Sequence, residues 1–114
     1  MNTINKLSNN EINISVTLEL LKIRYPNAKS FEYDKQQNCF WKEEVGVSSY
    51  EIYDYCNEHN DYMPVAIEHE ISIEFYDGLV ECEAKNYKHT SEWMSKADTG
   101  RAVCECFLMT REYV

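Results

Sequence analysis

Residues 71–84 read ISIEFYDGLVECEA. Apolar and polar side chains alternate strictly from Ile71 to Tyr76, which is the period of a β-strand with one buried face. Asp77-Gly78 follows, and this dipeptide is the strongest short signal for a two-residue hairpin turn. Leu79–Tyr87 is expected to return as the second strand. The sequence therefore predicts an antiparallel hairpin at its centre.

The two-residue turn fixes which residues of the hairpin lie opposite each other. The pairs expected on the buried face are Phe75 with Val80, Ile73 with Cys82 and Ile71 with Ala84. The pairs expected on the solvent face are Glu74 with Glu81, Ser72 with Glu83 and Glu70 with Lys85. Two carboxylates directly opposite each other cost some tenths of a kcal/mol, about 0.2–1 kcal/mol at most.

Helices are predicted on both sides of this hairpin. Ser8-Asn9-Asn10-Glu11 fits a capping box, so a helix should begin there and span about 9–24, ending before Pro26. Asp98 or Thr99 can cap a last helix at about 100–111. An apolar stripe at helical spacing, with Val103, Cys106 and Phe107, supports this second helix.

Shorter elements are expected elsewhere. Ser30–Tyr33 and Asn38–Lys42 are predicted to pair around Lys35-Gln36-Gln37, and Val45–Tyr55 contains a third short strand. The arrangement predicts an α+β fold for the single domain 1–114, an antiparallel sheet with the N-terminal and C-terminal helices packed on one face.

The remaining segments are polar or short. Cys56–Tyr62 is expected to be a turn. Pro64 is expected at the first position of a short helix over Val65–His69, since proline is favoured there. His89–Lys96 is predicted to be a loop or a weak helical turn around Trp93.

Charge is distributed unevenly along the chain. The formal net charge is -9, from 20 acids and 11 bases. Twelve of the acids lie between Glu43 and Glu83, where there is no lysine or arginine, so the flanks carry 11 bases against 20 − 12 = 8 acids. The twelve are Glu43, Glu44, Glu51, Asp54, Glu58, Asp61, Glu68, Glu70, Glu74, Asp77, Glu81 and Glu83.

This acidic block is interpreted either as a solubilising surface or as a docking face for a basic protein. Ordinary surfaces mix the two signs of charge, which favours docking. Direct binding to nucleic acid or to anionic lipid is not expected of so acidic a chain. The expected contact residues are Glu70, Glu74, Tyr76, Asp77, Glu81 and Glu83.

Tyrosines accompany the acids, and tyrosine is enriched at protein interfaces. Tyr50, Tyr53, Tyr55, Tyr62 and Tyr76 all fall within the block. We expect Tyr53 to pack in the core. A homodimer that buries the tyrosine surface is one alternative function.

Another alternative is a small metal- or thiol-dependent enzyme. Cys56-x-x-His59 has half the spacing of a zinc site, and His69, His89, Cys104 or Cys106 could complete it. Cys56 with His59, or Cys82 with a distant histidine, could form a thiolate pair. Cys82 is expected on the buried face of the hairpin, where a thiol is usually an inert packing residue. No complete catalytic, cofactor or metal motif is present, so the favoured expectation is a protein that is not an enzyme and needs no cofactor.

The five cysteines, the polar N-terminus and the lack of an apolar run of roughly 20 residues favour a cytosolic protein with reduced thiols. Three segments resemble small bacteriophage proteins of the NinX type: LSNNEIN near the start, DYCNEHNDYMPVAIEHEISIEF in the middle and RAVCECFLM near the end. Residues 27–53 show no such match. The resemblance implies a phage or prophage accessory protein in the bacterial cytoplasm and supplies no active site. A host or phage protein, for example in a nucleic-acid-binding complex of host defence, is then the expected basic partner, inhibited in the manner of an anti-CRISPR protein or DNA mimic.

Overall fold

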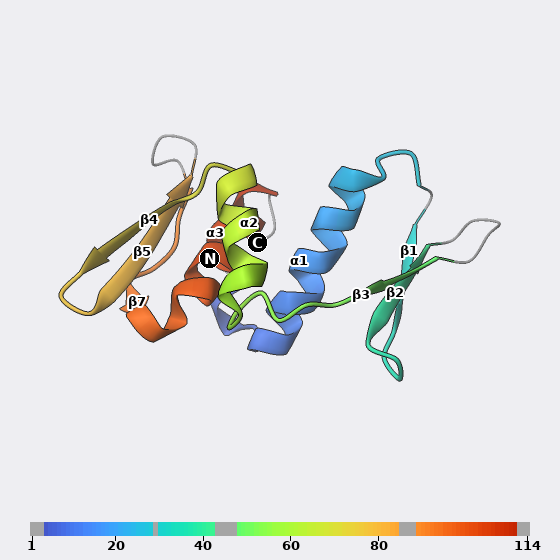
Figure 1. Cartoon of the computed structure of the whole chain (residues 1–114), viewed down its shortest axis with the longest axis horizontal. Coiled ribbons are helices and arrows are strands. Elements are labelled where there is room, and N and C mark those ends of the chain that lie inside the picture. Colours follow the sequence, from blue (N-terminus) through green and yellow to red (C-terminus); the bar gives the residue numbers. More distant parts are fainter. Residues whose placement is uncertain (1–3, 29, 43–47, 85–88, 112–114) are drawn as a thin grey trace.

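The computed structural model describes residues 4–28, 30–42, 48–84 and 89–111. The molecule is elongated, 50 × 28 × 27 Å, with an antiparallel sheet at each end and three α-helices between them (Figure 1). The predicted α+β class is confirmed. The strands are divided between two sheets because each sheet packs on a different helix, the first on the N-terminal helix and the second on the C-terminal helix.

The N-terminal helix α1 spans Asn9–Arg24, as predicted. Ser8 Oγ accepts the Glu11 N–H at 3.1 Å, and the Glu11 carboxylate accepts the Ser8 N–H at 3.0 Å. This reciprocal capping box satisfies two amides that have no partner inside the helix. A short 3-10 helix, η1 (Ile4–Lys6), precedes α1 and buries Ile4 completely in the main core.

The first sheet has the order β1-β2-β3, formed by β1 (Phe31–Asp34), β2 (Cys39–Lys42) and β3 (Ser49–Glu51). The predicted hairpin and third strand are therefore confirmed, although Val45–Val47 lie outside the described residues. Asp34 Oδ1 fixes the hairpin turn by accepting the N–H groups of Gln36 and Gln37 at 3.0 and 3.1 Å. Phe40 and Ile52 bury against Leu21 of α1, which makes a small separate core.

Helix α2 spans His59–Glu68, so the predicted turn is confirmed at Cys56 and Asn57 but is wrong from His59 onward, and the predicted first position of Pro64 is wrong. The helix begins one turn earlier, where the Glu58 carbonyl accepts the Tyr62 N–H at 3.0 Å. Pro64 is interior, and its missing N–H leaves the carbonyl of Asn60 without a helix partner. Asn60 is exposed, so water can bond to that carbonyl in place of the missing N–H.

The end of α2 displaces Glu70 from the predicted strand. The Glu70 N–H bonds to the Ile67 carbonyl, and the Ile71 N–H bonds to the Ala66 carbonyl at 2.8 Å. This is the bonding of a Schellman motif, which places Glu70 in the left-handed region at φ 53°. Glu70 therefore terminates the helix, and its predicted partner Lys85 lies outside the described residues.

The second sheet is built on the predicted hairpin, with β4 (Ser72–Tyr76) and β5 (Leu79–Ala84). Asp77 and Gly78 have φ values of 50° and 78°, the two positive angles that a type I′ turn requires. Five cross-strand pairs follow, and Glu74 lies opposite Glu81 as predicted. The burial of Phe75 was predicted wrongly, since its ring is 59% exposed. Phe75 is on the same side of the sheet as Val80, which is fully buried, but α3 packs mainly on β5 and leaves this part of β4 uncovered.

Two short strands complete the second sheet where a loop or helical turn was predicted. β6 (His89–Thr90) and β7 (Met94–Ser95) both pair with β5, and η2 (Lys96–Asp98) leads from them into the C-terminal helix. Helix α3 spans Thr99–Thr110 and is buried on almost every side between α1, α2 and β5. It forms the centre of the main core.

Candidate functional site

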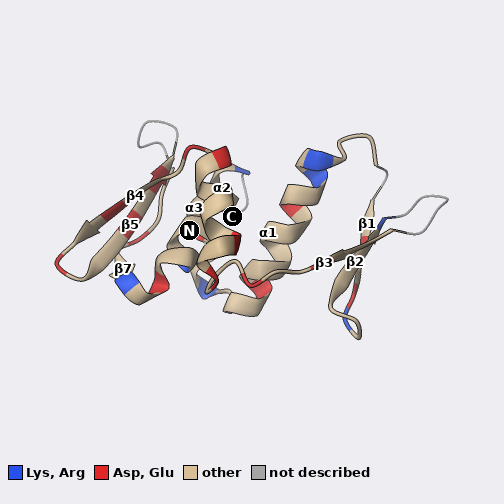
Figure 2. Ribbon diagram, in the orientation of Figure 1, with Lys and Arg blue, Asp and Glu red and all other residues tan. Residues whose placement is uncertain are grey.

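Four carboxylates of the second sheet belong to the hairpin formed by β4 and β5. Glu74 and Glu81 face each other across β4 and β5, Glu83 lies opposite Ser72 on the same face, and Asp77 occupies the turn. We call Glu74, Asp77, Glu81 and Glu83 the acidic hairpin surface. Figure 2 shows these acidic positions on β4, on β5 and at the turn between them. The positions of all four on the hairpin are as predicted, because the register follows from the turn.

Large apolar side chains are exposed beside these acids. Phe75 is 59% exposed, Tyr76 73% and Leu79 41%. We call these three residues the exposed tip. Tyr76 and Leu79 are a cross-strand pair next to the turn, and Phe75 lies on the opposite side of the sheet. An exposed aromatic group rimmed by polar residues is typical of a protein interaction site.

The acidic hairpin surface has no ion-pair partner among the described residues. Elsewhere in the described part of the chain, ion pairs join Lys22 and Arg111 to Glu19, and Arg101 to Glu105. Both acids lie outside the acidic block, on α1 and α3. These three bases of the flanks are thus paired on the helices, and the negative field of the hairpin is left uncompensated by them.

One base does lie close to the hairpin in the fold. Lys96 donates its backbone N–H to the Gly78 carbonyl at 2.9 Å, which brings η2 against the turn. Its side chain is exposed and forms no ion pair with Glu74, Asp77, Glu81 or Glu83. No sequence pattern indicated this neighbour, because Lys96 lies outside the acidic block.

Glu83 shows the strain of this crowding. One of its carboxylate oxygens, Oε2, is buried without a hydrogen-bond partner. The pKa of Glu83 is raised above its ordinary value of 4.5, first by loss of solvent around the carboxylate and then by the charges of Glu74 and Glu81. The folded state therefore holds a proton on Glu83 more tightly than the unfolded chain does.

Replacing Glu83 with glutamine is expected to stabilise the fold slightly at neutral pH. A raised carboxyl pKa contributes stability that is present below pH 4.5 and is lost as the pH rises through the folded-state pKa. Thermal unfolding of Glu83→Gln at pH 7 should thus give a higher Tm than wild type, and the difference should vanish below pH 4.5. Glu32→Gln, at an exposed position on β1, is the control. Its Tm should equal that of the wild type both at pH 7 and below pH 4.5. An unchanged or lower Tm for Glu83→Gln at pH 7 would contradict the raised pKa of Glu83 in the folded state.

The other acids of the block are spread over the rest of the molecule. Glu58, Asp61 and Glu68 belong to α2 or its N-terminal cap. Asp54 has a structural role, since its carboxylate accepts hydrogen bonds from Asn13 at 3.0 Å and from Asn57 at 3.1 Å. Glu43 and Glu44 lie outside the described residues. The block is therefore not one surface, and only its hairpin members share a sheet face.

The cysteines considered for metal binding or catalysis are packing residues. All five are buried. Burial raises the pKa of the Cys82 thiol and of the Cys106 thiol to about 12, and the pKa of Cys104 is raised well above 9.0, first by its hydrogen bond with Cys56 and then by burial. A nucleophilic cysteine needs the opposite shift. His59 meets the Tyr62 ring edge to face with ring centroids 5.4 Å apart, and the described residues hold no cluster of three or more metal-ligand side chains.

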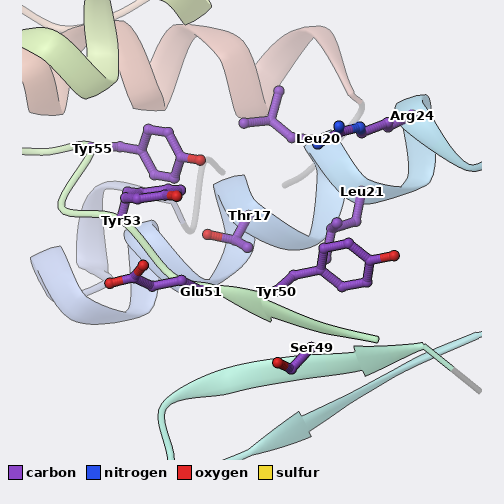
Figure 3. A pocket seen from close by; sticks show the side chains of 9 residues that line it. All are labelled: Thr17, Leu20, Leu21, Arg24, Ser49, Tyr50, Glu51, Tyr53 and Tyr55. Atoms are coloured by element: carbon purple, nitrogen blue, oxygen red, sulfur yellow. The ribbon is translucent and has the colours of Figure 1, made fainter. Parts of the chain in front are cut away.

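A tyrosine-lined groove lies between α1, β3 and α2, and the sequence did not predict it. Two adjoining hollows of about 550 and 420 Å³ share Leu20, Tyr53 and Tyr55. Tyr53 is 49% exposed, so its predicted core position is wrong, and Tyr55 is buried instead at 9%. Their rings meet at 83° with centroids 6.2 Å apart (Figure 3). Burial, then Asp61 and Tyr53, raise the pKa of Tyr55 to about 12.

Alternation could not have indicated which tyrosine is exposed, because Tyr53 and Tyr55 are two residues apart and a period of two places both on the same face. Strand β3 ends at Glu51, and the chain then turns toward Cys56, whose N–H bonds to Asn13 Oδ1 at 3.0 Å. After the strand ends, the period of two no longer assigns faces. The lining of the groove includes both signs of charge: the acids Glu51, Asp61 and Glu68 and the base Arg24. It therefore has less charge selectivity than the acidic hairpin surface.

Comparisons with protein-family models, with curated proteins and with solved structures find no match to this chain. The resemblance to phage proteins of the NinX type stays a prediction. The described residues contain no helix with the length and apolar character needed to cross a membrane.

Proposed function

We propose that this chain is a non-enzymatic binding protein that captures a basic protein surface through the acidic hairpin surface and the exposed tip. One observation carries the proposal: carboxylates without ion-pair partners among the described residues lie beside exposed aromatic side chains on a single ordered hairpin. An aromatic centre with a charged rim is a common anatomy of protein interfaces.

The physical gain on binding comes from two sources. Glu74 and Glu81 repel each other across the strands, and a lysine or arginine placed between them would replace that repulsion with attraction. Burial of Phe75, Tyr76 and Leu79 would add an apolar contribution that salt does not screen. The uncompensated field also speeds encounter with a positive partner.

The resemblance to phage proteins suggests the setting, the bacterial cytoplasm, and a host or phage protein as the partner. Alternate residues of a strand lie about 6.6–6.8 Å apart, so the hairpin carries its carboxylates in a flat grid. Such a grid can compete for lysine and arginine clusters that otherwise hold phosphates. Inhibition of a nucleic-acid-binding complex of host defence, in the manner of an anti-CRISPR protein or DNA mimic, is the biological role we propose.

Reversing both facing carboxylates tests the proposal. In Glu74→Lys/Glu81→Lys two lysines replace two glutamates, so the hairpin keeps a like-charge pair and the fold should be about as stable as wild type. Affinity purification from a bacterial lysate should recover a basic partner with the wild type at low salt and lose it steeply at high salt. The double variant should bind that partner more than about tenfold more weakly.

A matched variant separates local charge from net charge. Glu32→Lys/Glu51→Lys makes the same change of +4 at exposed positions of the first sheet. It should retain the partner. Equal loss in both double variants would mean that net charge alone governs binding, and unchanged binding in Glu74→Lys/Glu81→Lys would remove the hairpin from the interface.

A further inference from the structure

We infer that the open edge of β4 binds an extended strand of the partner, and that this strand alternates basic with apolar side chains. The inference deepens the proposed function, on which its choice of a basic partner rests. It assigns main-chain groups as well as side chains to the interface. The mode is strand addition, in which an extended peptide adds a strand to an exposed sheet edge.

Strand β4 lies at one side of the second sheet. The order is β4-β5-β6, with β7 also on β5, so every strand described in this sheet lies on one side of β4 (Figure 1). The residues of β4 are mostly exposed, and only Ile73 is partly buried. An edge strand of this kind presents a row of N–H and C=O groups without a ladder partner.

The direction of those groups follows from the bonds of β5. The Cys82 N–H donates to Ser91 Oγ at 2.8 Å, and the Cys82 carbonyl accepts the Ser91 N–H at 2.8 Å. Both main-chain groups of Cys82 therefore point away from β4. In an antiparallel ladder, facing residues that do not bond each other both point outward. Ile73, which faces Cys82, thus directs its N–H and C=O to the open edge.

Alternation extends the assignment along β4. Bonded and non-bonded pairs alternate in an antiparallel ladder, so Phe75, two residues after Ile73, also points outward. Ser72, Glu74 and Tyr76 bond inward to β5. The open edge therefore offers the N–H and C=O groups of Ile73 and of Phe75. An added strand can bond to these groups, because bonding residues on a strand recur at every second position.

The two faces of β4 specify the side chains of the added strand. A residue of the added strand that lies opposite Glu74 would also be one strand away from Glu81 and Glu83. The charges around it are all negative, so lysine or arginine is favoured there. On the other face its neighbours are Phe75, 59% exposed, and the partly buried Ile73, so an apolar residue is favoured. An added strand would cover the ring of Phe75 that the fold leaves exposed.

Charge also argues against a second copy of this chain as the occupant. In the antiparallel register that uses both Ile73 and Phe75, Glu74 of one copy would oppose Glu74 of the other. Like charges directly opposite are destabilising. The same carboxylate attracts a basic strand, so we commit to a partner strand of opposite charge.

Amide hydrogen exchange on the isotope-labelled full chain tests the inference. The probe is a capped peptide of sequence KVKVKVK in large molar excess. Exchange at Ile73 and Phe75 should slow by about tenfold or more, while Glu74, already bonded to β5, should change little. The peptide KVKPKVK has the same charge but cannot complete the ladder, and EVEVEVE has the opposite charge. Neither should protect Ile73 or Phe75.

The outcomes separate this inference from the proposed function. If both basic peptides perturb the amide signals of Glu74 and Glu81 equally without protecting Ile73 and Phe75, strand addition is wrong and the acidic hairpin surface still binds basic segments. If no peptide slows exchange at Ile73 and Phe75, strand addition is overturned, and the proposed function is decided by the charge-reversal purification. Protection that rises with protein concentration alone would identify a second copy as the occupant and overturn the basic-strand inference.

Discussion

Gly100→Ala is expected to lower the free energy of unfolding by about 3 kcal/mol or more, because the new methyl group has no space. Gly100 is the second residue of α3, where the helix passes directly against the chain before α2. A Cβ at this position would collide with the main-chain carbonyl oxygen of Cys56 and would lie 2.6 Å from Tyr62 Cδ2. The carbonyl belongs to rigid backbone, so relief requires α3 to move away from its contacts.

Urea denaturation of the purified variants measures this effect. Gly78→Ala is the matched control, because a Cβ at residue 78 would have no other atom within 4 Å and its cost comes only from the positive φ of 78°. That conformational cost is about 1–2 kcal/mol. Gly100→Ala should therefore unfold at a clearly lower urea concentration than Gly78→Ala. The reverse order would show that α3 does not approach Cys56 so closely.

Phe107→Ala is expected to cost about 3–5 kcal/mol, the usual loss for a fully buried phenylalanine. Phe107 has no exposed surface and its ring contacts His69 with centroids 4.7 Å apart. Phe75→Ala makes the same chemical change at a ring that is 59% exposed, and we expect a change within about 0.5 kcal/mol. Thermal unfolding followed by circular dichroism compares the two.

A fold that is lost altogether in Phe107→Ala would leave no transition to measure. Phe107→Leu keeps most of the volume and should give a smaller but measurable loss, roughly 1.5 kcal/mol or less. Phe75→Leu should leave the Tm unchanged. A Tm loss in the Phe75 variants equal to that in the Phe107 variants would place Phe75 in the core and would remove it from the exposed tip.

The elements that the sequence predicted correctly are those whose determinants are local. Ser8 and Glu11 bond to each other's main chain, and Asp77-Gly78 sets its own turn, so a window of a few residues contains all the information. The acidic hairpin surface was predictable for the same reason. Once the turn was fixed, the faces of Glu74, Glu81 and Glu83 followed from a period of two.

The wrong predictions depend on contacts between distant segments. Phe75 has the pattern of a core residue, but α3 packs mainly on β5, so it buries Val80 and leaves Phe75 of β4 exposed. Pro64 was assigned to a helix start on local preference, and the packing of Tyr62 against Gly100 adds a turn ahead of it. Whether Glu74 and Glu81 are paired also depends on where Lys96 and Arg101 lie in the fold, which no local pattern reveals.

The burial of α3 on almost every side has a consequence for how this protein is made. Every other described helix or strand precedes Thr99–Thr110 in the sequence, and α1, α2 and β5 all pack on that helix. During synthesis these earlier elements emerge with their apolar faces uncovered, and the core closes only after α3 has left the ribosome. Until then the nascent chain offers those faces to chaperones and proteases.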